Sequence, residues 1–160
     1  MNVTVIYGST NGATENVAKT IASKMGGKVV NIATAKAGDF ENSDLLILGA
    51  PTYEAGNIQQ DWEENLDVLK KADLSGKKVA LFGLGDQAGY PDTFVDAIGI
   101  LYDTLTEKGA TVVGETATSG YEFISSQAVR NGKFVGLALD EDGQQSETAQ
   151  RIANWIAQLS

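Results

Sequence analysis

A loop rich in hydroxyl and amide groups begins at the end of the first apolar run, VTVIY. The stretch YGSTNGATEN, residues 7–16, contains no lysine or arginine. A helical pattern starts within it, with Thr14 and Glu15 in the first turn. The start of a helix presents N–H groups without intrahelical acceptors and about half a unit of positive charge, to which Gly, Ser and Thr add amides and hydroxyls. The stretch is therefore either a phosphate-binding loop or an ordinary strand-to-helix turn capped by hydroxyls.

The spacing of its glycines separates this loop from two common nucleotide-binding motifs. Only three residues lie between Gly8 and Gly12, and no Gly-Lys-Ser/Thr follows, so the loop is not a Walker A motif. It also lacks the Gly-x-Gly-x-x-Gly pattern of dinucleotide-binding folds. Gly83 and Gly85 begin such a pattern later in the chain, but the next glycine is Gly89. Any phosphate held by the first loop must be bound by amides and hydroxyls alone.

Two further glycine-bearing loops follow apolar runs, and each contains a tyrosine. They are GAPTYEAGNIQQDWEENL, residues 49–66 with Tyr53, and GLGDQAGYPDTF, residues 83–94 with Tyr90. Two aromatic side chains beside a phosphate loop could hold a flat ring between them, although either tyrosine alone could equally be a core residue. Together the three loops favour a flat, phosphorylated ligand.

The elements that must position these loops alternate between short apolar runs and helical patterns. The runs cover residues 3–7, 28–32, 45–50, 78–84, 111–114 and 134–139, and the helical stripes lie at 14–25, 93–107 and 152–159. Runs without polar alternation are typical of strands buried on both faces. We predict an α/β fold, a doubly wound five-stranded parallel sheet with helices on both faces, whose ligand lies beyond the carboxyl ends of the strands.

One segment interrupts this alternation. ETATSGYEFISSQAVRNGK, about residues 115–133, separates TVVG from FVGLAL and has no helical period. We interpret it as an insertion that splits the last strand and forms a small side sheet. The absence of a linker or repeat predicts one domain over residues 1–160.

Composition excludes several kinds of chemistry. The chain has no histidine and no cysteine, which excludes Ser-His-Asp hydrolysis, thiolate nucleophiles and zinc–thiolate sites. We expect no metal site, and any redox chemistry requires a bound cofactor. No apolar run approaches the ~18 residues of a membrane span, and the first residues do not resemble a signal peptide, so we expect a cytoplasmic protein without membrane insertion.

Charge indicates the kind of partner. The net charge of −9 repels nucleic acid and anionic membranes, so partners should be basic or small. Acidic residues crowd the segments that flank the two tyrosine loops: Glu54, Asp61, Glu63, Glu64 and Asp67 near the first, and Asp86, Asp92, Asp96, Asp103 and Glu107 near the second. These residues form either a steering surface for a basic protein or ordinary solvated helix faces.

Five segments, in order, resemble the long-chain flavodoxins over essentially the whole chain. They are GSTNGATE, GAPTYEAGNIQQDWE, FGLGDQAGYPDTFVDAIGIL, the insertion GYEFISSQAVRNGK, and FVGLALDEDGQ. The resemblance implies an FMN cofactor whose phosphate is bound by Ser9, Thr10, Asn11, Gly12, Ala13 and Thr14. The family usually has Thr at the position of Asn11 and often Trp at that of Tyr53.

The resemblance also implies how the rest of FMN is held. Tyr90 would stack on the outer face of the flavin ring and Tyr53 on the inner face, while the backbone of Gly85, Asp86 and Gln87 would meet the pyrimidine edge. Asp142 would bond the ribityl hydroxyls, and Glu54, Ala55 and Gly56 would contact N5. Pro51, Thr52 and Asp92 complete the predicted cofactor-binding set. No residue is assigned a catalytic role, because the redox centre is FMN.

By this resemblance the protein is expected to be a monomeric, low-potential, one-electron carrier that shuttles between FMN semiquinone and hydroquinone. It would take electrons from a reductase, such as a ferredoxin/flavodoxin NADP reductase, or from a photosynthetic or metabolic donor, and pass them to an acceptor enzyme. An FMN-dependent NAD(P)H:quinone reductase is the alternative, but it needs open space above the ring where Tyr90 is expected. A signalling receiver domain needs an acidic pair after the first strand and an Asp after the third, where this chain has Gly8-Ser9 and Ala50-Pro51.

Overall fold

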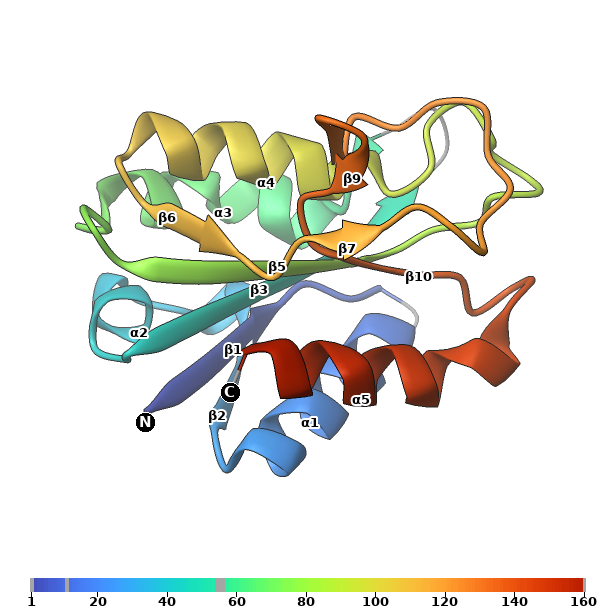
Figure 1. Cartoon of the computed structure of the whole chain (residues 1–160). Coiled ribbons are helices and arrows are strands. Elements are labelled where there is room, and N and C mark those ends of the chain that lie inside the picture. Colours follow the sequence, from blue (N-terminus) through green and yellow to red (C-terminus); the bar gives the residue numbers. More distant parts are fainter. Residues whose placement is uncertain (1, 11, 54–56, 160) are drawn as a thin grey trace.

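The computed structural model describes residues 2–10, 12–53 and 57–159, and a parallel sheet forms its centre (Figure 1). The strand order is β10-β5-β3-β1-β2, and every neighbouring pair on this path is parallel. The strands are β1 Val3–Tyr7, β2 Lys28–Asn31, β3 Leu45–Tyr53, β5 Lys78–Leu84 and β10 Leu137–Leu139. A short strand, β4 Asn57–Ile58, pairs antiparallel with the end of β3. The predicted doubly wound parallel sheet is confirmed.

Helices cover both faces of the sheet (Figure 1). On one face lie α1, Ala13–Met25, and α5, Thr148–Leu159; on the other lie α3, Gln60–Lys71, and α4, Asp96–Glu107. Consecutive residues of β3 alternate between two cores: Ile47 packs with the α1 and α5 side, and Leu46 and Leu48 pack with the α3 and α4 side. Burial on both faces explains why the strands read as continuous apolar runs.

The last strand position is shared by two segments, as predicted. β6, Thr111–Val113, pairs with Lys78–Ala80 of β5, and β10 pairs with Phe82–Leu84 of the same strand. Between them β7 Thr116–Ala117, β8 Val129–Arg130 and β9 Lys133–Phe134 form a small antiparallel sheet. The insertion therefore splits the strand and makes a side sheet of its own.

Several element boundaries differ from the sequence prediction. The helix expected from residue 93 begins at Asp96, because Val95 has a left-handed backbone with φ 48°. The run at 134–139 is two strands rather than one, with residues 135 and 136 outside both. The run at 28–32 ends as a strand at Asn31, whose side chain accepts a hydrogen bond from Ala33 N and caps a 3-10 turn, Ile32–Thr34. Three short helical elements were not predicted: α2 at Ala37–Glu41 and the 3-10 turns at Ile32–Thr34 and Gln145–Glu147. The sequence predicts a loop over residues 49–66, but α3 begins within it at Gln60.

None of the helices in the described part of the chain is long and apolar enough to cross a membrane.

The exit from β6 into the insertion depends on a contact between Gly114 and Trp155. Gly114 has φ 87°, and a Cβ added there would lie 2.8 Å from Trp155 Nε1. The indole N–H donates to Gly114 O at 2.8 Å, and the ring packs edge-on against Phe82 with centroids 6.4 Å apart. Trp155 thus joins α5, the centre of the sheet and the start of the insertion.

We predict that Trp155→Phe lowers the free energy of unfolding by about 1–3 kcal/mol, because the buried carbonyl of Gly114 loses its donor while most of the aromatic packing remains. Urea denaturation at equilibrium measures this difference. Gln158→Ala is the matched control, since Gln158 donates from the same helix to Glu115 O in an exposed position; it should change stability by no more than ~0.5 kcal/mol. Equal effects of the two substitutions would contradict the assignment.

Candidate functional site

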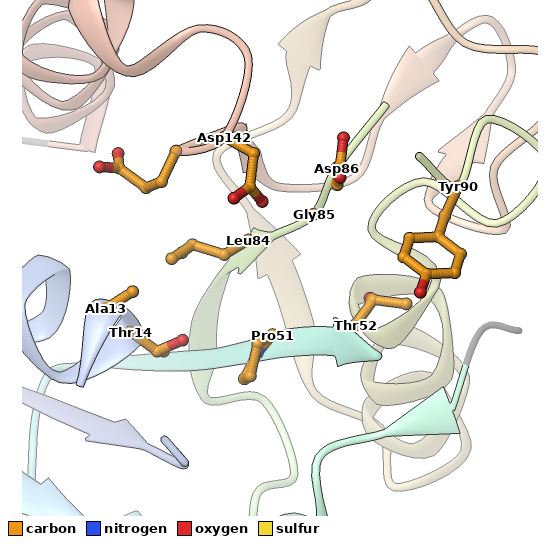
Figure 2. Close-up of a pocket in the computed structure, with 10 residues that line it drawn as sticks. Ala13, Thr14, Pro51, Thr52, Leu84, Gly85, Asp86, Tyr90 and Asp142 are labelled. Carbon is orange, nitrogen blue, oxygen red and sulfur yellow. The ribbon is translucent and has the colours of Figure 1, made fainter. Parts of the chain in front are cut away.

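A cavity of about 300 Å³ opens at the carboxyl ends of the strands, where the sheet order reverses (Figure 2). Four chain segments form its walls: the start of α1, the end of β3, the loop after β5 and the loop after β10. The residues that line it are Ala13, Thr14, Pro51, Thr52, Leu84, Gly85, Asp86, Tyr90, Glu141 and Asp142. Eight of these ten were predicted site residues. Leu84 and Glu141 were missed, although each is the direct neighbour of a predicted residue.

The first loop lies beside this cavity and leads into α1. Ser9 Oγ accepts a hydrogen bond from Gly12 N at 3.0 Å, and Gly12 has φ 91°, so the chain turns sharply before the helix begins at Ala13. Ser9 is half-buried and Thr10 is exposed. Thr14 is buried and reaches the cavity from the first turn of the helix. Asn11, also predicted to contact phosphate, lies outside the described residues.

The second loop, residues 49–66, is described except for residues 54–56: it contains the end of β3, the short strand β4 and the start of α3. Thr52 Oγ1 accepts a hydrogen bond from Ala97 N at 2.9 Å, which fixes the end of the strand to the start of α4. Pro51 and Thr52 both face the cavity (Figure 2). The predicted N5 contacts, Glu54, Ala55 and Gly56, lie outside the described residues, as does the side chain of Tyr53.

The third loop is folded on itself and presents an exposed tyrosine at the cavity. Gly85 N donates to Leu139 O at 2.9 Å, Asp86 Oδ1 accepts from Gly89 N at 2.9 Å, and Tyr90 N donates to Asp86 O at 2.8 Å. The Tyr90 side chain is 46% exposed and, with Thr52, forms one wall of the cavity (Figure 2). An aromatic ring held this way can cover a flat ligand from the solvent side.

Gln87, whose backbone is predicted to meet the ligand, joins three loops. Its backbone N–H and its side-chain amide both donate to Asp140 Oδ2, at 3.2 and 2.8 Å, and its Oε1 accepts from Glu122 N. Asp140 is fully buried, and its Oδ1 accepts from Asp142 N at 3.1 Å and Gly143 N at 2.8 Å. Gln87 is buried and is not among the residues that line the cavity, and its hydrogen bonds tie the third loop to the last loop and to the insertion.

Three carboxylates gather at this corner. Oxygens of Asp86, Asp140 and Asp142 lie within 4.8 Å of one another. Both oxygens of Asp140 already accept N–H bonds, so this carboxylate supports the loops. Loss of hydration raises the pKa of Asp142, and the negative charges of Asp86 and Asp140 raise it further. The corner resists the addition of negative charge.

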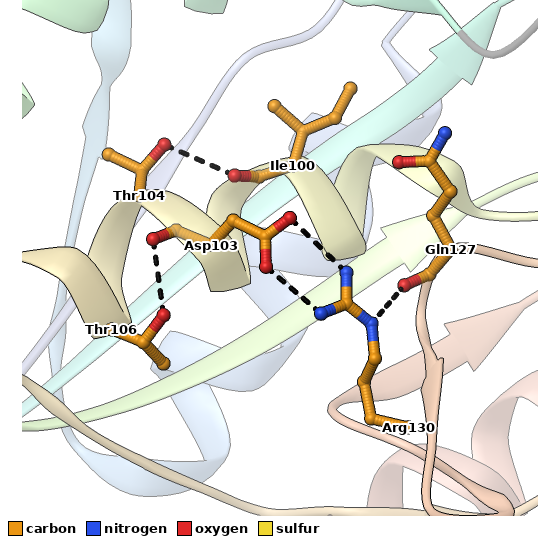
Figure 3. Close-up of polar contacts among 6 residues, drawn as sticks. All are labelled: Ile100, Asp103, Thr104, Thr106, Gln127 and Arg130. Carbon is orange, nitrogen blue, oxygen red and sulfur yellow. Dashed lines mark hydrogen bonds and ion pairs between the residues drawn. The ribbon is translucent and has the colours of Figure 1, made fainter.

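The insertion forms hydrogen bonds to the third loop, which carries Tyr90. Ile124 N and Ser125 N both donate to Pro91 O, at 2.7 and 3.0 Å, and Ser126 Oγ donates to Phe94 O. Further along, Arg130 donates two hydrogen bonds to the Asp103 carboxylate on α4, at 2.9 and 3.3 Å, and one to Gln127 O (Figure 3). The insertion thus runs beside the segment that carries Tyr90 and α4.

The acidic residues predicted around the two tyrosine-bearing loops do not all belong to one exposed, unpaired surface. Asp96 is buried, its Oδ1 accepts from Gln127 N at 2.8 Å, and burial raises the pKa of its carboxyl. Asp103 is paired with Arg130. Asp92 is exposed beside the tyrosine loop, outside the lining of the cavity, and its carbonyl accepts from Ser125 Oγ at 2.7 Å. Asp96 therefore does not belong to an exposed acidic face, and Asp103 lies in a partly exposed ion pair with Arg130.

Comparison with known proteins identifies relatives over nearly the whole chain. A family model described as Flavodoxin matches residues 5–155. A flavodoxin of Nostoc sp. is 47% identical over 158 residues, covering 97% of this chain and 93% of that protein, and one of Synechocystis sp. is 46% identical over 159 residues, covering 97% and 94%. A crystal structure of Fusobacterium nucleatum flavodoxin bound to flavin mononucleotide has a TM-score of 0.93 at 35% identity, covering 99% of this chain and 96% of that one.

We predict that Asp86→Asn lowers the pKa of Asp142, because it removes a neighbouring negative charge that disfavours ionisation. Carboxyl chemical shifts followed by NMR through a pH titration report this pKa directly. Asp92→Asn removes the same charge from outside the cavity and should leave the Asp142 titration unchanged. An Asp142 pKa that is the same in the wild type and in Asp86→Asn would show that the charge of Asp86 does not contribute to it.

Proposed function

Because this chain belongs to the flavodoxin family, we propose that it binds FMN in the cavity beyond the strands and carries electrons one at a time between other proteins. The observation that supports this most strongly is the cavity itself. It joins a hydroxyl-rich helix start to a wall containing Tyr90, at the edge where doubly wound sheets bind ligands. FMN, when bound, supplies the redox chemistry, and the protein supplies binding, a charged environment and a docking surface.

The first loop suits the phosphate of FMN. Between residues 7 and 14 the chain has no acidic side chain, and its hydroxyls and the start of α1 offer donors and a partial positive charge. Charge-assisted hydrogen bonds to a phosphate are stronger than those between neutral groups. We propose that Ser9, Thr10, Asn11, Gly12, Ala13 and Thr14 hold the phosphate, as the family resemblance implies.

The opposite side of the cavity suits the flat ring of FMN and disfavours a negative charge on that ring. Tyr90 shields this side from water, and Asp86 and Asp142 place negative charge beside it. Partial burial and nearby carboxylates both disfavour a further negative charge. We propose that these groups lower the potential of the second electron relative to the first, so that the protein works between its one-electron and two-electron reduced forms.

We also propose that Glu54, Ala55 and Gly56 would contact N5 of FMN, with the Glu54 carbonyl as the acceptor of a hydrogen bond from N5 when N5 bears a hydrogen. This proposal rests on the sequence, in which a small residue and a glycine follow Glu54. A glycine allows the peptide between Glu54 and Ala55 to turn its carbonyl toward N5 at low conformational cost.

We predict that, after reconstitution with FMN, a redox titration near neutral pH accumulates a blue one-electron-reduced form as the main species at the midpoint. Gly56→Val should reduce this accumulation, because a β-branched side chain hinders the peptide turn, and Gly56→Ala should have an intermediate effect. Absorption spectra recorded during the titration measure the three species. A single two-electron wave would favour the quinone reductase alternative, and failure to take up FMN would remove the flavin proposal altogether.

We predict that electron transfer from a basic reductase slows as salt rises, because the Debye length falls from roughly 30 Å at 0.01 M to about 3 Å at 1 M. Asp92→Asn, beside the tyrosine loop, should slow transfer roughly two- to fivefold at low salt and have little effect at high salt. Asp73→Asn is the control: Asp73 is exposed near the start of β5, at the other end of the sheet. Stopped-flow rates that do not depend on salt would contradict electrostatic steering.

A further inference from the structure

Gln59, which the sequence analysis did not assign to the site, lies buried beneath the first loop. It is the residue before α3, and its side chain is 1% exposed. The loop approaches it closely: a Cβ added to Gly8 would lie 2.3 Å from Gln59 Oε1 and 2.6 Å from Trp62 Cδ1. Gly8 therefore allows the amide of Gln59 to reach the underside of the loop.

Three hydrogen bonds fix which way this amide points. Its Oε1 accepts from Trp62 N at 3.3 Å, while its Nε2 donates to Asp61 Oδ2 at 3.0 Å and to Thr10 Oγ1 at 3.1 Å. A backbone N–H needs an acceptor and a carboxylate needs a donor, so exchanging the oxygen and nitrogen would lose two of the three bonds. Both hydrogens of the amide nitrogen are therefore used, one of them on Thr10.

The hydrogen bond from Gln59 Nε2 determines whether the Thr10 hydroxyl can act as a donor toward a ligand. A hydroxyl has one hydrogen to donate, and an oxygen that accepts from Gln59 must direct that hydrogen elsewhere. Thr10 is exposed and lies in the loop that leads into α1. Its hydrogen is thus available to an acceptor outside the protein, at the place where the partial positive charge of the helix also acts.

We propose that Gln59 is a positioning residue that holds the Thr10 hydroxyl as a hydrogen-bond donor toward the phosphate of the cofactor. The inference rests on the proposed function, because it requires FMN in this cavity. A phosphate dianion has only acceptors, so a loop whose hydroxyl is fixed as a donor selects it. Riboflavin ends in a hydroxyl that carries no charge, and it gains little from such a donor. Gln59 accordingly contributes to selection of FMN over riboflavin without touching either.

The test compares Gln59→Glu with Gln60→Glu. Both add one negative charge at the start of α3, but Gln60 is exposed and its side chain bonds Glu64. In Gln59→Glu one carboxylate oxygen still accepts from Trp62 N, while the other accepts a hydrogen bond from the Thr10 hydroxyl, which turns that donor inward. Dissociation constants for FMN and riboflavin are measured by flavin fluorescence quenching at about pH 8, above the second phosphate pKa of ~6.

Gln59→Glu should weaken FMN binding roughly 10- to 100-fold more than Gln60→Glu does. Riboflavin affinity should agree between the two variants within roughly threefold. Equal FMN losses in the two variants, or an equal loss of FMN and riboflavin affinity in Gln59→Glu, would overturn the inference. A wild-type protein that binds no FMN would instead overturn the proposed function, so the two failures are distinguishable.

Substitutions at Thr10 keep the inference testable if Gln59→Glu does not fold, because this side chain is exposed. Thr10→Val removes the donor and should weaken FMN binding while leaving riboflavin binding unchanged, whereas Thr10→Ser should retain FMN affinity. In the Thr10→Val background, Gln59→Glu should add little further FMN-specific loss. Wild-type FMN affinity in Thr10→Val, or full additivity of the two changes, would show that Gln59 does not act through Thr10.

Discussion

The parallel register of β1, β3 and β5 brings the loops of the site to one edge of the sheet. Tyr7 of β1 pairs with Gly49 of β3, and Gly49 pairs with Phe82 of β5. The three strands therefore end within a few residues of the same level of the sheet. Gly49 lies between Tyr7 and Phe82 at this level, and its carbonyl accepts hydrogen bonds from Gly8 N at 3.2 Å and from Trp62 Nε1 at 2.8 Å. One backbone group thereby fixes the start of the first loop and the packing of α3. The position of Gln59 under Thr10 depends on the same packing, since Gln59 precedes the helix that Trp62 anchors.

A second set of contacts holds the other wall of the cavity. Asp140 is buried, and both of its carboxylate oxygens accept hydrogen bonds from backbone or side-chain amide N–H groups. Through Gln87 it links the loop after β5 to the loop after β10. The insertion adds a further layer, because its backbone bonds Pro91 next to the exposed Tyr90. A loop that presents an aromatic ring to solvent has few contacts of its own, so its order must come from the segments behind it. The split in the last strand places the insertion there.

The two ends of the cavity differ in charge in a way that suits a ligand with a phosphate at one end and a ring that is reduced at the other. The start of α1 attracts an anion, whereas Asp86 and Asp142 oppose one, and the raised pKa of Asp142 is a sign of that opposition. Under the proposed function, the protein would favour the negative charge of the FMN phosphate and disfavour the negative charge that the ring would gain on full reduction. No metal or titrating histidine is required for this separation, because fixed dipoles and carboxylates supply it.

The sequence by itself determined the sheet, the three loops and the absence of histidine and thiolate chemistry, because uninterrupted apolar runs and glycine-rich turns are local signals. Its resemblance to the flavodoxins also identified most residues of the cavity wall, and these residues come together because the carboxyl ends of parallel strands meet at one edge. Tertiary structure decided which polar side chains face the site. Asp96 reads as a surface acid on its helix but is buried against the insertion, and Asp103 is paired with Arg130, because residues distant in sequence pack over them. Gln59 was not predicted to belong to the site, and Gln87 was predicted to meet the ligand only through its backbone; the contacts of their side chains arise from partners 49 and 53 residues away in the chain. Such contacts have no local pattern, since the fold alone brings their two ends together.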